Sequence, residues 1–212
     1  GLSPSTTYHL HVYEYNGSGA SANYLTSTAS GNPNSQATSA SVNSTASDII
    51  RHTSFTEPSN IDYTLYQATD ITDANSLELA RFTIRDGGAT ADADAQPTTL
   101  DAITLQVQNR LQLRQVAIYD GTTEIAELQS ATQVVFTGLS GLVAPDGGTK
   151  DFSVRVTFSN DVTDNVRIAF TVTNATANAG GSTFAAANAG GAASSQNSDR
   201  GRIEVTATKL AF

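Results

Sequence analysis

The stretch from residue 86 to residue 94 carries the side chains with the clearest capacity for chemistry. Asp86-Gly87-Gly88-Ala89-Thr90-Ala91-Asp92-Ala93-Asp94 places three carboxylates within nine residues, spaced by small residues. Calcium prefers six to eight hard oxygen ligands, and loops that join β-strands often supply them. Carboxylates this close together also repel one another and need compensation from a cation, a base or solvent. We therefore predict a calcium site at Asp86, Asp92 and Asp94, completed by Asp101.

A solvated loop between two strands is the alternative interpretation of this acidic stretch, because exposed charges keep a sheet edge soluble. Its spacing does not match the helix-flanked calcium loop, whose acidic positions are 1, 3, 5 and 12 of twelve. Asp62 is a weaker candidate for a ligand from another strand. The Asp161, Asp164 and Asn165 group, like Asp120-Gly121 and Asp146-Gly147-Gly148, is typical of turns.

Patterns that indicate catalysis are weak in this sequence. His9 and His11 share one face of a predicted strand, but Tyr8, Leu10 and Val12 occupy the inward face and no third ligand lies nearby. Gly138-Leu139-Ser140-Gly141 lacks the second spacer of the nucleophile elbow. The number of carboxylates leaves paired-carboxylate glycoside hydrolysis open. Trp is absent, however, and seven Tyr offer little sugar-stacking surface. We predict that the protein is not an enzyme.

Composition excludes several other classes of function. The 212 residues contain no Cys, which rules out disulfides and thiolate metal sites. The net charge of −9 repels polyanions, so nucleic acid is not an expected partner. No apolar run approaches the ~18 residues that a membrane span needs. Only 39% of residues are hydrophobic and 15% are charged, and the Thr, Ser, Asn and Gly that replace them are typical of exposed β-proteins.

The elements that would position these residues read as β-strands. Two segments alternate strictly between apolar and polar residues, at 152–158 and 166–172, which predicts strands with one buried face and one exposed face. The seven residues between them, 159–165, are short enough for an antiparallel hairpin. Further predicted strands cover Ile61–Gln67, Leu77–Arg85, Leu100–Gln108, Leu111–Tyr119, Thr123–Leu128, Gln133–Phe136 and Arg202–Thr208.

Two of these strands change apolar phase, one between Leu79 and Ala80 and the other between Leu113 and Val116, which indicates β-bulges or crossings between sheets. Ala185–Ser195 has no apolar helical face and is predicted to be a loop. The whole pattern predicts an all-β protein whose main domain, residues 47–212, is an antiparallel, immunoglobulin-like β-sandwich of about nine strands.

The first 31 residues have a different signature. Leu2, Pro4 and Tyr8 stand in the order Leu-x-Pro-x-x-x-Tyr at the start of a strand, which resembles the tyrosine corner of fibronectin type III domains. Asn16-Gly17 predicts a tight hairpin turn. The resemblance implies that residues 1–31 are the last two strands of an incomplete domain, whose other strands lie upstream or in a neighbouring subunit. Residues 32–46 are polar and uncharged, and we predict a linker there.

The main domain resembles a repeat family of very large secreted surface proteins of the Bacteroidetes. The phrases that carry the resemblance are Asn60-Ile61-Asp62-Tyr63, Phe82-Thr83-Ile84-Arg85-Asp86-Gly87-Gly88, Val116-Ala117-Ile118-Tyr119-Asp120-Gly121, residues 182–191 and the closing Ile203–Phe212. The resemblance implies a non-enzymatic structural or adhesive module of a long extracellular surface protein, with neighbouring modules as partners. Two alternatives are a module that binds cell-surface or environmental glycans and a subunit of a filament joined by β-strand addition.

Overall fold

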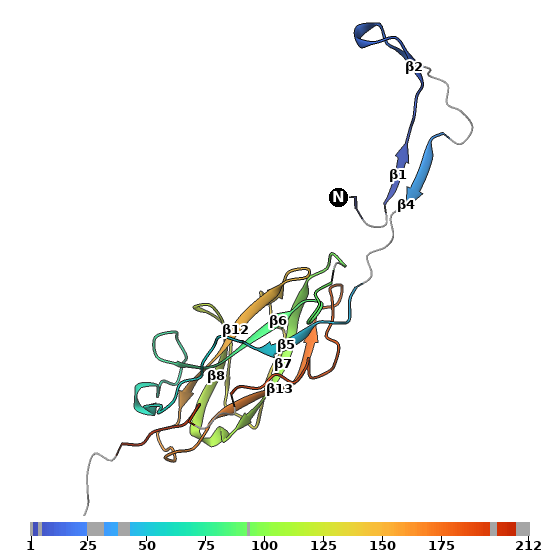
Figure 1. Ribbon diagram of the computed structural model, residues 1–212. Coiled ribbons are helices and arrows are strands. Elements are labelled where there is room, and N and C mark those ends of the chain that lie inside the picture. The colour runs from blue at the N-terminus through green and yellow to red at the C-terminus, as the bar shows by residue number, and fades with distance from the viewer. Residues whose placement is uncertain are drawn as a thin grey trace, which may run out of the picture. The chain divides into compact units, whose positions relative to one another are not determined.

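The protein is almost entirely β-structure, as the computed structural model shows for residues 2–3, 6–24, 32–37, 43–92, 94–195 and 199–206. The chain forms two compact units, residues 1–42 and residues 43–212 (Figure 1). Helical turns in the described residues are limited to the three-residue 3₁₀ turns η1 (Gly19–Ser21), η2 (Tyr63–Leu65) and η3 (Arg110–Gln112). Accordingly, none of the helices in this described part could cross a membrane.

The described residues of the first unit form two short antiparallel strand pairs. Strand β1 (Thr7–Leu10) pairs with β4 (Asn34–Ala37), and β2 (Tyr15–Asn16) pairs with β3 (Asn23–Tyr24). None of the described side chains in this unit is buried, and two strands alone are too few to build a core. Leu10 is 66% exposed and Val12 is 65% exposed, so the predicted inward face of the first strand is not covered here.

Three predictions for this unit have clear outcomes. The backbone N–H of Ser3 donates to the Tyr8 hydroxyl at 2.7 Å, the kind of contact that a tyrosine corner requires, whereas Pro4 lies outside the described residues. The hairpin at Asn16-Gly17 is present, because β2 pairs with β3, but its tight two-residue turn is wrong, since Asn16 pairs with Asn23 around a longer loop. The linker prediction is wrong at Asn34–Ala37, which form β4.

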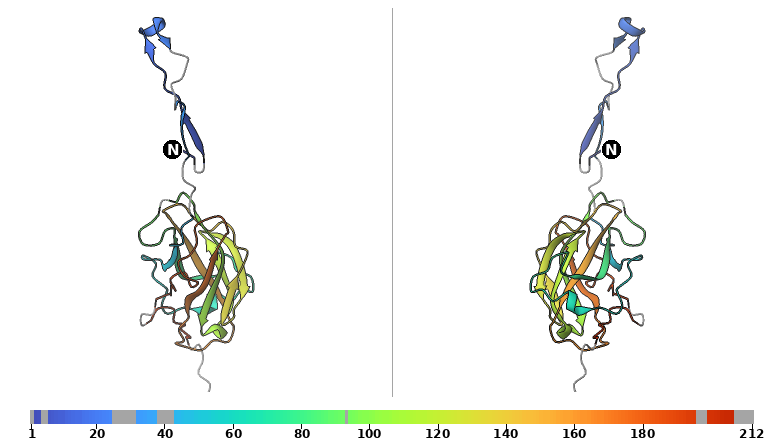
Figure 2. Two further views of the ribbon diagram at one scale, coloured as in Figure 1. Left: turned by 90° about the vertical axis from the view of Figure 1, so that its right-hand side faces the viewer. Right: turned by 90° about the vertical axis from the view of Figure 1, so that its left-hand side faces the viewer.

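In its described residues, the second unit is an antiparallel β-sandwich of nine strands, which confirms the predicted fold class (Figure 2). One sheet has the order β5-β6-β12-β8-β9, and in the other β7 pairs with β13, β10 and β11. The strands are β5 (Asp48–Arg51), β6 (Leu77–Arg85), β7 (Thr98–Gln108), β8 (Leu113–Asp120), β9 (Thr123–Gln129), β10 (Gln133–Phe136), β11 (Val143–Ala144), β12 (Thr149–Phe158) and β13 (Ala169–Ala177).

Apolar side chains from the facing sides of the two sheets form one core. Phe82 of β6 and Phe152 of β12 stand opposite each other in register, with ring centroids 5.9 Å apart, and both are buried. The core also takes in Ile84, Leu105, Val116, Ile118, Val154, Val156, Phe158, Phe170 and Val172. Alternation of inward and outward residues along each strand places these side chains on one face, because successive residues of a strand point to opposite sides.

Both predicted phase changes are β-bulges. The pairing of β12 with β6 skips Leu79, and the pairing of β12 with β8 skips Arg114. An extra residue in one strand moves the apolar side chains that follow it back onto the buried face. The predicted tight turn at Asp120-Gly121 is also confirmed, because Asp120 pairs with Thr123 across a two-residue loop in which Gly121 has φ +60°.

The predicted hairpin between 152–158 and 166–172 is wrong. Strand β12 pairs with β6 and β8, whereas β13 pairs with β7 in the other sheet, so residues 159–165 cross from one sheet to the other. Ile61–Gln67 is not a strand either, since it holds one isolated bridge at Ile61 and the turn η2. Of Arg202–Thr208, only Arg202 and Ile203 make bridges among the described residues.

The outer face of the five-stranded sheet is less exposed than the alternation predicts. A loop in residues 66–76 lies against β8 and β12, where Ile71 packs with Ala117 and Tyr119 in a small second cluster. The Tyr119 hydroxyl donates to the Ile71 carbonyl at 3.3 Å, and the Ile71 amide donates to Glu127 at 2.9 Å. Burial and the nearby Glu124 raise the pKa of Tyr119 to about 12, so its hydroxyl stays a donor at neutral pH.

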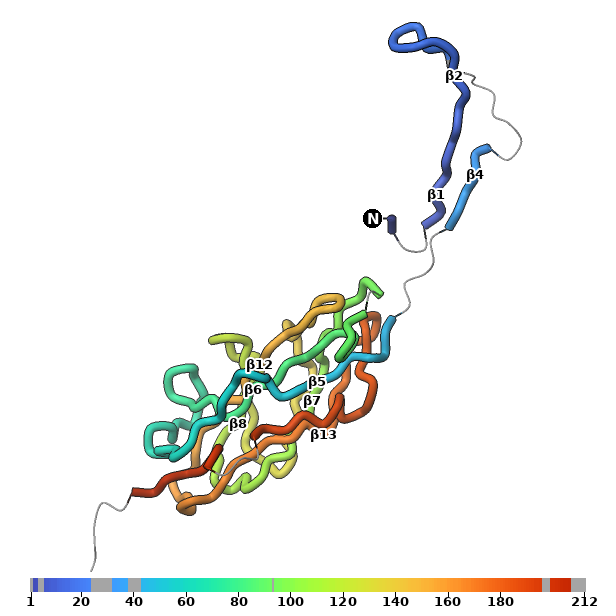
Figure 3. The backbone as a smooth tube through the Cα atoms, viewed as in Figure 1, coloured from blue at the N-terminus to red at the C-terminus, as the bar shows by residue number. Residues whose placement is uncertain are grey.

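A segment rich in Ala and Gly, residues 183–194, closes one side of the sandwich. The Ile49 amide of β5 donates to Ala189 at 2.7 Å, and the Val172 amide of β13 donates to Ala192 at 2.8 Å. The segment therefore joins an edge strand of one sheet to an edge strand of the other, beside β13 in Figure 3. It is an irregular loop, as predicted, and its small side chains allow this close backbone approach.

The Phe82–Phe152 pair gives a direct test of the core. We expect Phe82→Ala to lower the free energy of unfolding by about 3–5 kcal/mol, because it leaves a cavity between two packed sheets. Leu111→Ala is the matched control, since Leu111 is 68% exposed. That control should change stability by less than about 0.5 kcal/mol. Urea unfolding followed by circular dichroism measures both, and equal losses in the two variants would contradict the assigned core.

Candidate metal centre

Two loops at the same end of the sandwich carry the candidate site. The first joins β6 to β7 and begins at Asp86, directly after β6 ends. The second joins β11 to β12 and contains Asp146. Hydrogen bonds run between the loops in both directions, because the Gly147 amide donates to Asp86 Oδ2 at 2.8 Å and the Ala95 amide donates to Asp146 Oδ1 at 3.2 Å. These bonds hold the acidic side chains of both loops together.

Glycine at position 87 makes the tight course of the first loop possible. Gly87 has φ +68°, a conformation that L side chains rarely adopt. A Cβ atom at this position would lie 2.3 Å from the Asp92 amide nitrogen. Because the loop folds back this closely on itself, Asp86 and Asp92 can approach each other although five residues separate them in the sequence.

Asp86 is the most deeply buried of the acidic residues, at 1% exposure. It accepts a short hydrogen bond from the Thr98 hydroxyl, which in turn shares a bond of 2.7 Å with the Ser47 hydroxyl. The Gly87 amide also donates to Ser47 at 3.2 Å. Ser47 and Thr98 are fully buried, so this hydrogen-bond network fixes the Asp86 carboxylate from the interior of the protein.

Asp94 is held by three donors. Its Oδ2 accepts from the Ser44 amide and from the Ser182 hydroxyl, the latter at 2.6 Å, and its Oδ1 accepts from the Gln96 amide at 2.7 Å. Burial disfavours the charged form of Asp94, but these hydrogen bonds outweigh burial and lower its pKa. Asp94 is therefore a stable carboxylate at neutral pH.

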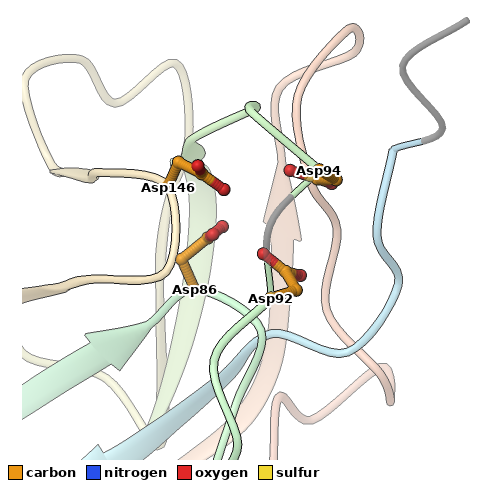
Figure 4. Close-up of side chains that lie close together, drawn as sticks. All are labelled: Asp86, Asp92, Asp94 and Asp146. Carbon is orange, nitrogen blue, oxygen red and sulfur yellow. The ribbon is translucent and has the colours of Figure 1, made fainter. Parts of the chain in front are cut away.

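Asp92 lacks such support. Both of its carboxylate oxygens are buried, and neither accepts a hydrogen bond of normal geometry from the described residues. The nearby Ser44 hydroxyl favours the charged form, but burial and the carboxylates of Asp86 and Asp94 outweigh that effect and raise the pKa of Asp92. A carboxylate oxygen of Asp92 points toward the space that the other three carboxylates share (Figure 4).

Four carboxylates thus converge on one space. Each of Asp86, Asp92, Asp94 and Asp146 offers an oxygen, and these oxygens all lie within 4.8 Å of one another. At that separation two unit charges repel by about 3 kcal/mol for an effective dielectric constant of about 20. Among the described residues, this is the one group of three or more His, Asp and Glu side chains close enough to share a metal ion.

The structure brings together three of the four residues that the sequence predicts as ligands, Asp86, Asp92 and Asp94, and leaves Asp101 outside the group. Asp101 lies within β7, and its carbonyl accepts a hydrogen bond from the Leu139 amide at 2.8 Å. The fourth member, Asp146, is one that the sequence indicates only as a turn residue. The two glycines that follow Asp146 do not indicate its contact with the other three aspartates, because that contact depends on the pairing of β6 with β12.

Other acidic candidates have local structural roles. The Asp62 side chain caps η2, where it accepts from the Thr64 amide at 3.1 Å. Asp164 accepts from the Val205 amide at 2.8 Å, and Asn165 has φ +60°, as suits a turn residue. His11 contacts the Tyr13 hydroxyl at 3.3 Å, and neither it nor His9 belongs to the acidic group.

No protein-family model matches this chain, and a search of the curated proteins likewise returned no match. The resemblances to fibronectin type III domains and to bacterial surface repeats therefore stay predictions.

Replacing Asp92 tests the repulsion within the group. In the presence of a chelator, we expect Asp92→Asn to raise the melting temperature by a few degrees at pH 7. The amide removes one negative charge and can donate to Asp86. Because the pKa of Asp92 in the folded protein lies above the ordinary 3.8, the penalty for its charge exists at neutral pH and disappears as the pH falls toward 3.8.

The advantage of Asp92→Asn should therefore shrink between pH 7 and pH 4. Thermal unfolding of both proteins across this range measures it, with Asp101→Asn as the control that changes charge outside the group. A destabilised Asp92→Asn protein in chelator at pH 7 would argue against repulsion at this position.

Proposed function

We propose that this chain is a non-enzymatic structural module in which a calcium ion fastens the loops at one end of the β-sandwich. Asp86, Asp92, Asp94 and Asp146 would hold the ion. The observation that carries the proposal is the pair of buried carboxylate oxygens of Asp92, which accept no hydrogen bond of normal geometry from the described residues and lie among three further carboxylates. A bound cation supplies the positive charge that these oxygens lack, and it converts mutual repulsion into shared attraction.

The chemistry of the donors favours calcium over other biological cations. All four donors are hard oxygens, which suit Ca²⁺ and Mg²⁺ better than Zn²⁺ or Cu²⁺. Ligands on opposite sides of Ca²⁺ lie about 4.6–5.2 Å apart, whereas around Mg²⁺ they lie about 4.0–4.2 Å apart. The four oxygens lie within 4.8 Å of one another, close enough for one Ca²⁺ ion to contact all of them. Its flexible coordination tolerates loop ligands better than the near-ideal octahedron that Mg²⁺ demands. Water or backbone carbonyls would fill the remaining positions.

An extracellular location fits a site of this kind. Asp146 is exposed, so one side of the ion would face solvent, and an open site of this type holds calcium weakly. Extracellular modules typically bind calcium with dissociation constants of about 10⁻⁴–10⁻³ M. The division of the chain into two compact units supports a modular protein. In such a protein, a stiff sandwich would keep adhesive or structural neighbours at a defined spacing.

Calcium titration tests the proposed function. We expect calcium at one hundred times its dissociation constant to stabilise the protein by about 2.7 kcal/mol relative to chelator. For a unit of this size, that corresponds to a rise in melting temperature of about 5–10 °C. Magnesium at the same concentration should produce a smaller rise. Differential scanning calorimetry with each ion and with chelator gives the comparison.

Two variants make the titration decisive. Asp92→Asn should abolish the calcium-dependent rise and remain well folded in chelator, so that loss of the response cannot be attributed to unfolding. Asp101→Asn should keep the full rise, because Asp101 lies outside the acidic group. Identical melting temperatures of the unaltered protein in calcium and in chelator would exclude the calcium site.

A further inference from the structure

The acidic group contacts the segment by which the chain enters the second unit. The division between the two compact units falls between residues 42 and 43, so residues 43–47, called here the incoming segment, are the first of the second unit. The Ser44 amide donates directly to Asp94 Oδ2, and the Ser44 hydroxyl lies beside Asp92. Two of the four proposed calcium ligands therefore contact Ser44.

The rest of the incoming segment is attached to the same region. The Ser44 carbonyl accepts from the Thr183 amide at 2.8 Å, and the Ser47 amide donates back to the Thr183 carbonyl at 3.2 Å. The Ala46 carbonyl lies so close to Gly88 that a Cβ atom there would approach it to 2.5 Å. These contacts place the incoming segment between the acidic loop and the closing segment at residues 183–194.

We propose that the cation at the acidic group acts as a clamp on the incoming segment. This inference rests on the proposed calcium site. Without a cation, repulsion between Asp92 and Asp94 favours their separation, and movement of Asp94 weakens its bond to the Ser44 amide. With a cation bound, Asp94 is fixed by the ion and by Ser182, and the Ser44 amide keeps its acceptor. Calcium concentration would thus control how firmly the incoming segment is held against the rest of the second unit.

Hydrogen exchange of the Ser44 amide in the full chain tests the clamp. Local opening that breaks the calcium site should slow by up to about a hundredfold at one hundred times the dissociation constant. We expect exchange at Ser44, followed by NMR, to slow by about ten- to a hundredfold in calcium relative to chelator. The matched control is the Thr64 amide, which also donates to an aspartate, Asp62, outside the acidic group. Its exchange should stay unchanged.

Comparison of hydrogen exchange with calcium binding distinguishes failure of the clamp from failure of the calcium site. Calcium binding detected by isothermal titration calorimetry, with less than a twofold change at Ser44, would overturn the clamp and leave the calcium site standing. Calorimetry without binding would overturn both. In Asp92→Asn, calcium should leave Ser44 exchange unaltered, and a change there equal to that of the unaltered protein would also contradict the clamp.

Discussion

The close approach of two loops at one end of the sandwich determines the properties of the candidate site. Gly147 donates to Asp86 and Ala95 donates to Asp146, so each loop supplies a donor to a carboxylate of the other. The antiparallel pairing of β6 with β12 brings the end of β6 beside the start of β12, and thereby sets this meeting. A fold that holds four carboxylates together in this way has to compensate their repulsion. Hydrogen bonds do so at Asp86 and Asp94, and the proposed cation would do so at Asp92.

Local features of the fold follow from the sequence more readily than its topology does. Alternation, phase changes and turn residues predict strands β6 and β10, the bulges at Leu79 and Arg114 and the turn at Gly121, because each depends on neighbours along one strand. The partner of a strand depends instead on the whole sandwich. Residues 159–165 are long enough for a hairpin and equally long enough to cross between the sheets, and nothing in their composition distinguishes the two.

The same distinction explains the outcome at the acidic group. Asp86, Asp92 and Asp94 lie in one loop, so proximity in sequence is sufficient to predict their proximity in space. The prediction of Asp101 as a ligand is wrong although this residue is near the others in sequence. Strand β7 begins at Thr98 and directs alternate residues to opposite faces. Thr98 and Leu100 are buried, which places Asp101 on the other face of the strand. Asp146 can be predicted as a member of the group only once the pairing of β6 with β12 is known.

The burial of the Asp92 carboxylate oxygens distinguishes this acidic loop from a fully solvated one. A loop whose charges serve solubility keeps them in water, where each carboxylate is hydrated and repulsion is weak. Asp92 instead has two buried oxygens that accept no hydrogen bond of normal geometry from the described residues, next to carboxylates that raise its pKa. Removal of a charge from water is unfavourable unless a partner replaces the lost hydration. Gly87 allows a tight loop that directs Asp92 inward, and the proposed cation would supply the missing partner at the point where the chain enters the sandwich.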